Sequence, residues 1–136
     1  METDCVFCAI AAGEAPAHVV AEADHAIAFL DLNPAADGHT LVVPRRHVSE
    51  LSHVRAEEGA EMFALAARIS GAMRGTLAPA VNLHLADGAE AGQDVLHTHL
   101  HVIPRSFGDG VVLRFPLDRD AAALEASAQR LRDLLG

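Results

Sequence analysis

Short apolar runs bounded by turn residues recur along the chain. Such runs predict β-strands when glycine, proline, aspartate or asparagine stands at their ends. Five segments fit this description, at residues 18–23, 26–31, 39–44, 80–85 and 97–104. The turn chemistry is clearest between the second and the third of them, where the sequence reads Asn-Pro-Ala-Ala-Asp-Gly. We therefore expect five strands.

Helical spacing of apolar residues marks three other segments. The clearest prediction is a helix over residues 56–77, with acidic side chains in its first turns and arginines later, which complements the helix dipole. Its apolar stripe comprises Met62, Leu65, Ala66, Ile69, Met73 and Leu77. Residues 5–12 predict a short helix, and residues 120–135 predict a last amphipathic helix capped by Asp118 or Asp120.

The order of these elements, strands then helix then strands then helix, favours an α+β fold with a mainly antiparallel sheet. A parallel sheet would need more helices to connect its strands. A length of 136 residues suits one hydrophobic core, and 51% of the residues are hydrophobic. Because no repeat or low-complexity linker divides the sequence, we expect a single domain over residues 1–136.

The composition of the chain argues against two classes of partner, membranes and nucleic acids. No apolar run approaches the roughly 20 residues that a membrane-spanning helix needs, and the acidic start of the sequence does not resemble a secretory signal. We therefore expect a cytoplasmic protein without a membrane partner. The formal net charge of −9 argues against a nucleic-acid surface, although a small phosphate ligand remains compatible with it. All basic residues are arginines, so a catalytic or phosphate-binding lysine is excluded.

Two cysteines, Cys5 and Cys8, stand in a C-x-x-C spacing near the start of the sequence. A structural disulfide is disfavoured in a reducing cytosol, and a redox pair would follow a strand, which is absent here. Metal binding fits better. Two ligands cannot close a metal site, so the remaining ligands must come from elsewhere in the chain.

Three histidines, His97, His99 and His101, occupy alternate positions of the last predicted strand. Alternate residues of a strand point to one face, so the three rings are expected on the same side of the sheet. Burial of three imidazoles without a purpose would be costly, because each ring nitrogen needs a partner. Two functions fit the pattern: a metal centre, or a nucleophilic middle histidine that its neighbours orient.

The sequence His-Thr-His-Leu-His-Val-Ile, followed by Pro-Arg, resembles the signature of the histidine triad (HIT) family. The preceding "AGQDVLH" and the segment 28–47 resemble two further motifs of this family, and "CVFCAI" with "GEAP" resembles the N-terminus of its bacterial Hint-like members. The resemblance runs from about Cys5 to Arg105. It implies an α+β HIT fold, with a five-stranded antiparallel sheet and two main helices, and a homodimer.

The resemblance also implies an activity. The middle histidine of the family attacks the α-phosphorus of a nucleotide, so His99 would form a nucleotidyl-histidine intermediate that water later cleaves. His101 would bind or polarise the phosphate, and Gln93 would contact the phosphate near the leaving group. The leading prediction is a purine nucleoside phosphoramidase. The alternatives are a dinucleoside polyphosphate hydrolase, a nucleotide-binding scaffold protein with little catalysis, and a histidine-ligated metal enzyme.

Further residues match the family's nucleotide pocket and metal site. Asp31 would accept hydrogen bonds from the ribose hydroxyls, although its position alone also fits an ordinary turn aspartate. The matching residues for the base pocket are Ile27, Phe29 and Leu32. For a structural zinc ion, the matching ligands are Cys5, Cys8, His47 and His97, a closed Cys₂His₂ set.

The sequence also departs from the family pattern. Ala86-Asp87-Gly88 stands where Hint-like proteins often have an asparagine that contacts the phosphate region. Asp94 replaces a residue that is often serine, and an added carboxylate beside a phosphate is unfavourable if it points inward. Arg105 is a candidate to offset this charge, although its position also fits an ordinary surface arginine. The departure at Asp94 leaves the preference for a leaving group open.

Overall fold

All five predicted strands and all three predicted helices are present in the computed structural model, which describes residues 4–112 and 120–136. The strands are β1 (Val19–Glu22), β2 (Ala26–Leu30), β3 (Thr40–Pro44), β4 (Ala80–His84) and β5 (Leu100–Arg105). The helices are α1 (Val6–Ala11), α2 (Ala56–Met73) and α3 (Ala121–Leu135), with short 3₁₀ turns at Leu51–His53 and Ala89–Ala91.

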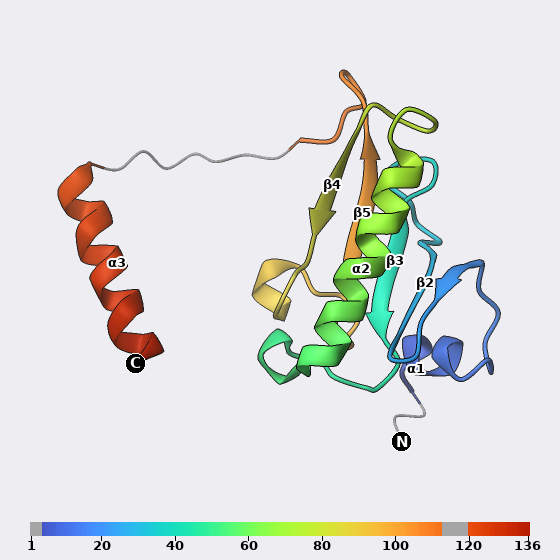
Figure 1. The fold of residues 1–136 in the computed structure, drawn as a ribbon, viewed down its shortest axis with the longest axis horizontal. Coiled ribbons are helices and arrows are strands. Elements are labelled where there is room, and N and C mark those ends of the chain that lie inside the picture. The colour runs from blue at the N-terminus through green and yellow to red at the C-terminus, as the bar shows by residue number, and fades with distance from the viewer. Residues whose placement is uncertain (1–3, 113–119) are drawn as a thin grey trace.

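The strands form one antiparallel sheet in the order β1-β2-β3-β5-β4, which confirms the predicted α+β fold (Figure 1). The pairing of β3 with β5 joins the two halves of the chain in the middle of the sheet. In this pairing Leu41 lies opposite His101 and Val42 lies opposite Leu100. The register therefore brings the end of the histidine motif beside the segment after the Asn-Pro turn.

Each face of the sheet has its own apolar cluster. On one face, α2 packs across the sheet (Figure 1), and the buried cluster consists of Ala26, Ala28, Val42, Met62, Leu65, Ala66, Met73 and Val102. On the other face, the buried cluster consists of Phe7, Ile10, Ile27, Phe29, Leu41 and Val43, so that α1 covers this side. The alternation of side chains along β2 and β3 assigns neighbouring residues to opposite clusters.

The long helix ends four residues earlier than its apolar periodicity predicts. It stops at Met73, because Arg74 is extended and Gly75 has a φ of +81°, a conformation that favours glycine. Leu77 therefore does not extend the apolar stripe of α2. Instead it lies on the turn after the helix, 57% exposed, where its side chain approaches Gly38.

The last strand begins three residues later than predicted. Its ladder starts at Leu100, whereas the amide of Thr98 donates to the carbonyl of Val48, 2.7 Å away, in the segment that follows β3. The amide of His97 donates to Val95 O in a tight local turn. His97 and His99 are thus held in a connecting segment that is anchored to a loop, and only His101 belongs to β5.

The C-terminal helix α3 stands apart from the sheet (Figure 1). Asp120 caps it, because the Asp120 carboxylate accepts from the amide of Ala123 at 2.8 Å, while the other predicted cap, Asp118, lies outside the described residues. None of the α3 side chains is buried, although the helix carries an apolar face with Leu124 and Leu131. Among the described residues, no helix has the length and apolar character needed to cross a membrane.

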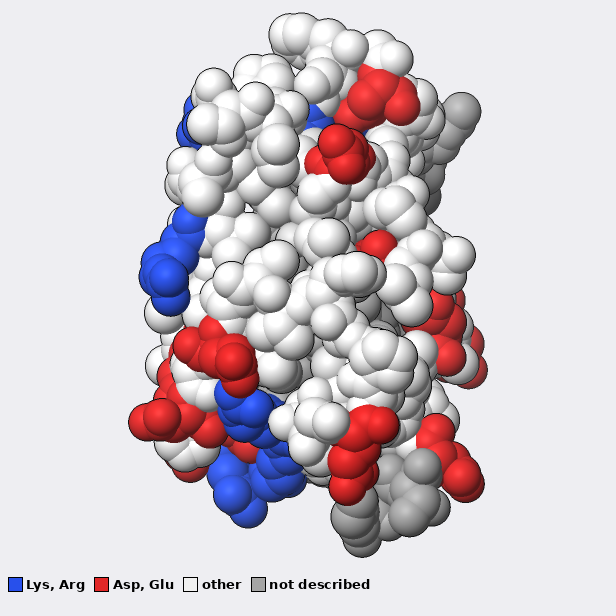
Figure 2. All heavy atoms as spheres, turned by 90° about the vertical axis from the view of Figure 1, so that its right-hand side faces the viewer, with Lys and Arg blue, Asp and Glu red and all other residues white. Residues whose placement is uncertain are grey.

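Charged groups are unevenly spread over the surface. Figure 2 shows the face that forms the right-hand side of Figure 1, with acidic side chains at several separate places and arginines mainly along its left edge and lower left. Among the described residues on this face, the arginines form no continuous basic stripe. The distribution agrees with the net charge of −9.

A buried ion pair fixes the segment that connects β3 with α2. Arg46 Nε and Nη2 donate to the two carboxylate oxygens of Glu58 at 2.9 Å each, and Glu58 is only 2% exposed. The same carboxylate accepts from the amide of Arg55, at the start of α2. Arg46 also donates to the carbonyl of His53, which closes the loop between them. Hydrogen bonds from Arg46 hold the pKa of Glu58 below its ordinary value.

We expect Glu58→Gln to lower the free energy of unfolding by about 2 kcal/mol, since the amide keeps the volume but leaves Arg46 without its charged partner. Urea unfolding at pH 7 measures this change. A lowered pKa stabilises the fold above the ordinary glutamate pKa of about 4.3, so the difference between wild type and variant should shrink as the pH falls below that value.

The matched control is Glu57→Gln, because Glu57 is exposed on the same turn of α2. It should change the stability by less than about 0.5 kcal/mol. Equal stability of wild type and Glu58→Gln at pH 7 would contradict the structural role of the pair.

Candidate functional site

The three histidines of the motif lie on the sheet face that α1 covers. His97 and His99 are buried, and His101 is partly buried. The ring of Phe7, from α1, contacts the rings of both His97 and His99 edge-on, with centroid distances of 5.9 and 5.2 Å. The rings of His99 and His101 are 5.0 Å apart. The predicted placement on one side of the sheet is thus present, although only His101 is in a strand.

His99 has a tautomer that suits a nucleophile. Its Nδ1 lies 2.8 Å from the carbonyl oxygen of His97, and a carbonyl can only accept, so Nδ1 carries the proton. In the neutral ring, Nε2 then keeps its lone pair. Nε2 faces the mouth of a pocket, where the Asp94 carboxylate is 3.6 Å away. An imidazole held in this way can attack an electrophile without first losing a proton.

A chain of hydrogen bonds also sets the tautomer of His101. The amide of Ala35 donates to His39 Nδ1 at 2.9 Å, so neutral His39 carries its proton on Nε2. That nitrogen lies 2.8 Å from Nδ1 of His101 and donates to it. Neutral His101 therefore presents an Nε2–H group beside His99.

Both members of this chain are held in the neutral form. Burial lowers the pKa of His101 to about 4, and the neighbouring rings of His99, His39 and His84 act in the same direction. Burial also lowers the pKa of His39, against the opposing effect of Asp31. At neutral pH His39 and His101 are therefore neutral, and His101 offers one N–H donor to the site.

The pocket in front of these histidines has a volume of about 180 Å³. Its walls are largely apolar, and the predicted base-pocket residues Phe29 and Leu32 both line it. Leu32 is 75% exposed at the rim, while Phe29 is buried at the back. Ile27 does not line the pocket, because it is buried one step further inside the apolar cluster under α1. Its position is that of a core residue that supports the wall.

Asp31 lies at the edge of the same pocket, next to the histidine chain. Its Oδ2 is 3.5 Å from His39 Nε2 and 3.9 Å from His101 Nδ1, and its Oδ1 accepts from the amide of Asn33. The side chain is 18% exposed, so a ligand can still reach it. The structure thus brings Asp31, His99 and His101 together, as the sequence predicted.

The three polar groups of Asp31, His39 and His101 lie close enough to one another to suggest a metal ion. The tautomers oppose this. A metal needs the lone pair of His39 on Nε2, whereas the amide of Ala35 already occupies the lone pair on Nδ1 and leaves Nε2 protonated. We therefore interpret this group as a hydrogen-bonded chain.

Gln93 lies outside the pocket, in the loop before the motif. Its amide oxygen accepts from the amide of Gly88 at 2.8 Å, and its Nε2 donates to the carbonyls of Ser49 and Val95 at 3.0 and 3.1 Å. With all these groups engaged, Gln93 holds the loop closed in this structure. It is not among the residues that line the space in front of His99.

Asp94, the departure noted in the sequence, points to solvent beside that space. Its side chain is 83% exposed. Among the described residues, the one charged or ionisable partner within 4.0 Å of its carboxylate is His99, whose Nε2 lies 3.6 Å from Asp94 Oδ1. Arg105 does not offset its charge, because Arg105 is bound to Asp109, Asn82 and the carbonyl of Val111 at the far end of β5. The predicted compensation by Arg105 is therefore wrong.

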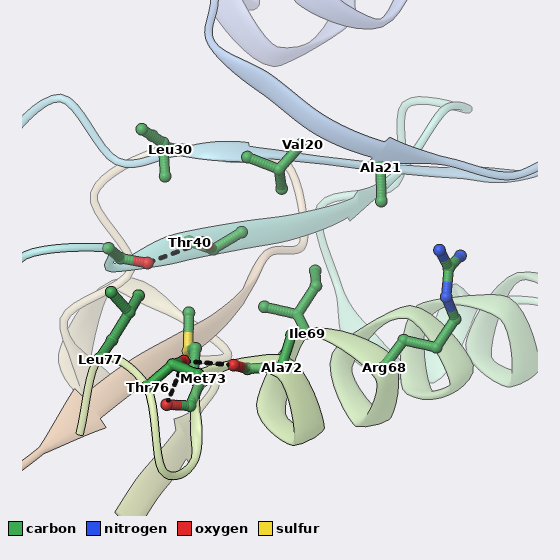
Figure 3. A pocket seen from close by; sticks show the side chains of 11 residues that line it. Val20, Ala21, Leu30, Thr40, Arg68, Ile69, Ala72, Met73, Thr76 and Leu77 are labelled. Carbon is green, nitrogen blue, oxygen red and sulfur yellow. Dashed lines mark hydrogen bonds between the residues drawn. The ribbon is translucent and has the colours of Figure 1, made fainter.

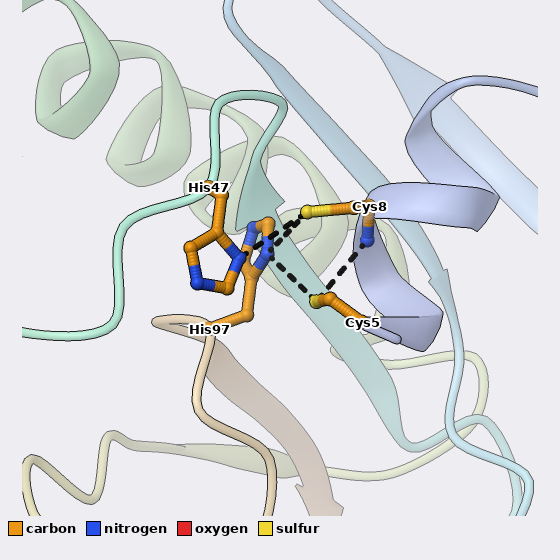
Figure 4. A group of neighbouring side chains, drawn as sticks. All are labelled: Cys5, Cys8, His47 and His97. Carbon is orange, nitrogen blue, oxygen red and sulfur yellow. Dashed lines mark hydrogen bonds between the residues drawn. The ribbon is translucent and has the colours of Figure 1, made fainter. Parts of the chain in front are cut away.

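The side chains of Cys5, Cys8, His47 and His97 point toward one another and form a second cluster (Figure 4). Two ligands come from α1 and the residue before it, one from the segment after β3, and one from the histidine motif. Cys5 Sγ is 3.4 Å from His97 Nδ1, and Cys8 Sγ is 3.3 Å from His47 Nδ1. All four ligand atoms lie within 4.8 Å of one another.

The dimensions and the tautomer of this cluster fit zinc. Tetrahedral zinc, with bonds of about 2.3 Å to sulfur and about 2.0 Å to nitrogen, separates sulfur and nitrogen ligands by about 3.5 Å. His97 Nε2 lies 2.7 Å from the carbonyl of Pro44 and donates to it, which leaves the Nδ1 lone pair directed at the cysteines. Burial lowers the pKa of His97 and favours this neutral ligand form.

Another hollow, of about 360 Å³, lies on the other face of the sheet, between β1, β2 and the end of α2 (Figure 3). Aliphatic side chains dominate its walls, and Arg68 is its one charged lining residue among those described. The hydroxyls of Thr40 and Thr76 donate to carbonyls of their own turns. Among its described lining residues, this hollow therefore has no nucleophile or general base that could carry out a reaction.

Two residues of the site, His39 and Phe7, are not predicted by the sequence. His39 stands in "GHT", directly after a turn and at the start of a predicted strand. Phe7 stands in the short predicted helix. Both act through tertiary contacts, His39 with His101 and Phe7 with His99, so the signal available in the sequence was limited to the residue type.

Comparisons with known proteins agree with this site. A family model described as "HIT domain" matches residues 12–108. An uncharacterised HIT-like protein of Mycobacterium tuberculosis is 45% identical, over 93% of this chain and 94% of that protein. The protein named adenylylsulfatase HINT3 of Arabidopsis thaliana is 36% identical, over 96% of this chain and 67% of that protein.

A crystal structure described as a Zn-bound histidine triad family protein from Mycobacterium smegmatis is similar at a TM-score of 0.75 and 39% identity, over 96% of this chain and 97% of that one. The residues that the family model matches, 12–108, contain the histidine motif, the paired strands β3 and β5, and most of the residues that line the pocket in front of His99. The chain belongs to the histidine triad (HIT) family.

Proposed function

We propose that this protein is a nucleotide hydrolase that cleaves at the α-phosphate through a nucleotidyl-histidine intermediate on His99, with purine nucleoside phosphoramidates as substrates. HIT family proteins are in general nucleotide hydrolases. The observation that carries the proposal is the fixed tautomer of His99, whose unprotonated Nε2 faces a pocket with apolar walls.

The shape of the pocket supports a nucleoside as ligand. Phe29 and Leu32 offer flat and aliphatic surface for a base, and Asp31 offers carboxylate oxygens to ribose hydroxyls at the rim. A nucleoside bound in this way directs its 5′-phosphate toward His99. Because the apolar wall, Asp31 and His99 surround one space, the reacting atoms can be held in line for attack.

In the proposed reaction, His99 Nε2 forms a bond to the α-phosphorus while the bond from phosphorus to the leaving nitrogen breaks, and this nitrogen takes up a proton from solvent and leaves as an amine. Water then attacks the same phosphorus and gives a proton back to solvent, and cleavage of the Nε2–phosphorus bond releases a nucleoside monophosphate and restores the imidazole. The carbonyl of His97 stabilises the positive charge that develops on the ring, because it accepts a hydrogen bond from the Nδ1–H group throughout the reaction.

His101 contributes as a neutral donor. Its Nε2–H group can donate to a phosphate oxygen as negative charge builds up on the transferring group. The donation depends on the proton at Nε2, which His39 and the amide of Ala35 fix. We infer that His39 positions His101 and does not itself contact the substrate.

We further propose that Cys5, Cys8, His47 and His97 hold a structural zinc ion. Four protein ligands would close the site, so zinc bound there would crosslink α1, the segment after β3 and the histidine motif without a free position for substrate. His97 connects the two centres, since its side chain belongs to the cluster and its carbonyl orients His99. The homodimer, the cytoplasmic location and the single domain over residues 1–136 stay predictions.

We expect His99→Ala to reduce kcat for adenosine 5′-phosphoramidate by at least about a thousandfold, because the nucleophile is removed. Mass spectrometry of the quenched wild type should find a nucleotidyl adduct on His99. The control is His53→Ala, since His53 is exposed on a loop, and its rate should equal that of the wild type. A folded wild type that gives neither turnover nor adduct would indicate a nucleotide-binding scaffold.

Metal analysis of the purified protein should find about one zinc ion per chain, and Cys5→Ser should lose most of it. Removal of zinc by a chelator should lower the melting temperature of the wild type, because three segments lose their crosslink. His53→Gln should retain the zinc of the wild type. A wild-type protein that binds no zinc after refolding with excess metal would refute the site.

The pKa of His101, about 4, predicts a distinctive titration. Its ring resonances in an NMR titration, assigned with a His101→Gln variant, should shift near pH 4, whereas the urea-unfolded chain should titrate near 6.5. Because the unfolded chain takes up this proton first, stability should fall as the pH drops from about 6.5 to about 4. A midpoint above 6 in the folded protein would contradict the neutral donor.

A further inference from the structure

We propose that Asp94 selects leaving groups by their charge, so that this site prefers a leaving amine that carries an additional positive charge and disfavours an anionic one. The inference rests on the proposed function and deepens it, since it names the substrate class. It is carried by the position of one exposed carboxylate and by the charges around it.

Asp94 stands at the boundary of two hollows. It lines the nucleotide pocket together with His99, and it also lines an adjoining hollow that includes Asp4, Ser49 and His47. A nucleoside that fills the first hollow, with its α-phosphorus at His99, leaves the second as the adjoining space for the leaving group. The leaving group would then pass the Asp94 carboxylate, which is 3.6 Å from the attacking nitrogen.

The charges along this route are negative. The residues that line the nucleotide pocket include the carboxylates Asp31 and Asp94, and those that line the adjoining hollow include Asp4 and Asp94. Among the described lining residues, neither hollow contains an arginine, and the whole sequence contains no lysine. Arg45 and Arg46, which directly precede His47 in the chain, are engaged with Glu22 and Glu58, and Arg105 is engaged with Asp109.

A leaving group that ends in phosphate, sulfate or carboxylate would meet these carboxylates as a like charge. An ammonium group would instead form an ion pair with Asp94. The carboxylate is 83% exposed, so water and salt screen it, and its effect should be a few-fold in rate. The same carboxylates would also repel the leaving group of a dinucleoside polyphosphate, because this group is a polyanion.

The experiment compares two adenosine phosphoramidates that share the scissile phosphorus–nitrogen bond. One releases ethylenediamine, which carries a second amine with a positive charge, and the other releases glycine, which carries a carboxylate. For the wild type, kcat/KM should be about tenfold higher for the cationic leaving group. Asp94→Asn should reduce this ratio by about fivefold, and 0.5 M salt should reduce the wild-type ratio as well.

The matched control is Glu90→Gln, which removes one negative charge from the same loop at an exposed residue outside both hollows. It should keep the wild-type ratio. An Asp94→Asn protein with the wild-type ratio, or a wild type that prefers the glycine conjugate, would overturn the role of Asp94 while the nucleotidyl-histidine chemistry stands. No turnover of either substrate by the wild type would instead refute the proposed function, and this inference with it.

Discussion

The hydrogen bond from His99 Nδ1 to the carbonyl of His97 is the interaction on which the site depends. It fixes the position of the proton on the proposed nucleophile, through a residue whose own side chain belongs to the Cys₂His₂ cluster. His97 in turn donates to the carbonyl of Pro44, the last residue of β3. The ring of His99 is therefore connected through one residue, His97, to the sheet and to the cluster. Since a carbonyl is a fixed acceptor, this arrangement needs no charged side chain to orient the ring.

Much of the fold could be predicted from the sequence, because strand and helix periods are local properties. The apolar stripe of α2 from Met62 to Met73 packs on the sheet as its spacing predicts. The errors lie at the ends of elements. Leu77 continued the helical period, yet Gly75 ended the helix in a conformation that periodicity does not encode. Likewise, the apolar alternation from His97 onward predicted a strand, but the amide of Thr98 found its acceptor in the loop at Val48.

The candidate site was predictable to a different degree. The histidines, the cysteines and Asp31 belong to motifs, so the resemblance assigned them, and the structure brings them together in two adjoining centres. The position of Gln93 depends on how its loop closes, and the position of Ile27 depends on how deeply it is buried. A sequence motif contains neither kind of information. Gln93 is engaged by three backbone groups, and Ile27 lies behind the pocket wall. His39 was overlooked because its role arises only when β3 and β5 pair.

The hydrogen bond from the amide of Ala35 to His39 has a consequence for which substitutions this site tolerates among related sequences. The amide that sets the proton order of His39 and His101 belongs to the backbone, so almost any side chain at position 35 can supply it. Only proline lacks the donor. The proton order proposed for the site therefore depends on the path of the main chain through the turn between β2 and β3. Most substitutions of the side chain at position 35 would therefore leave the proton order unchanged. A change in the length of the turn would move the amide and so disturb the proton order.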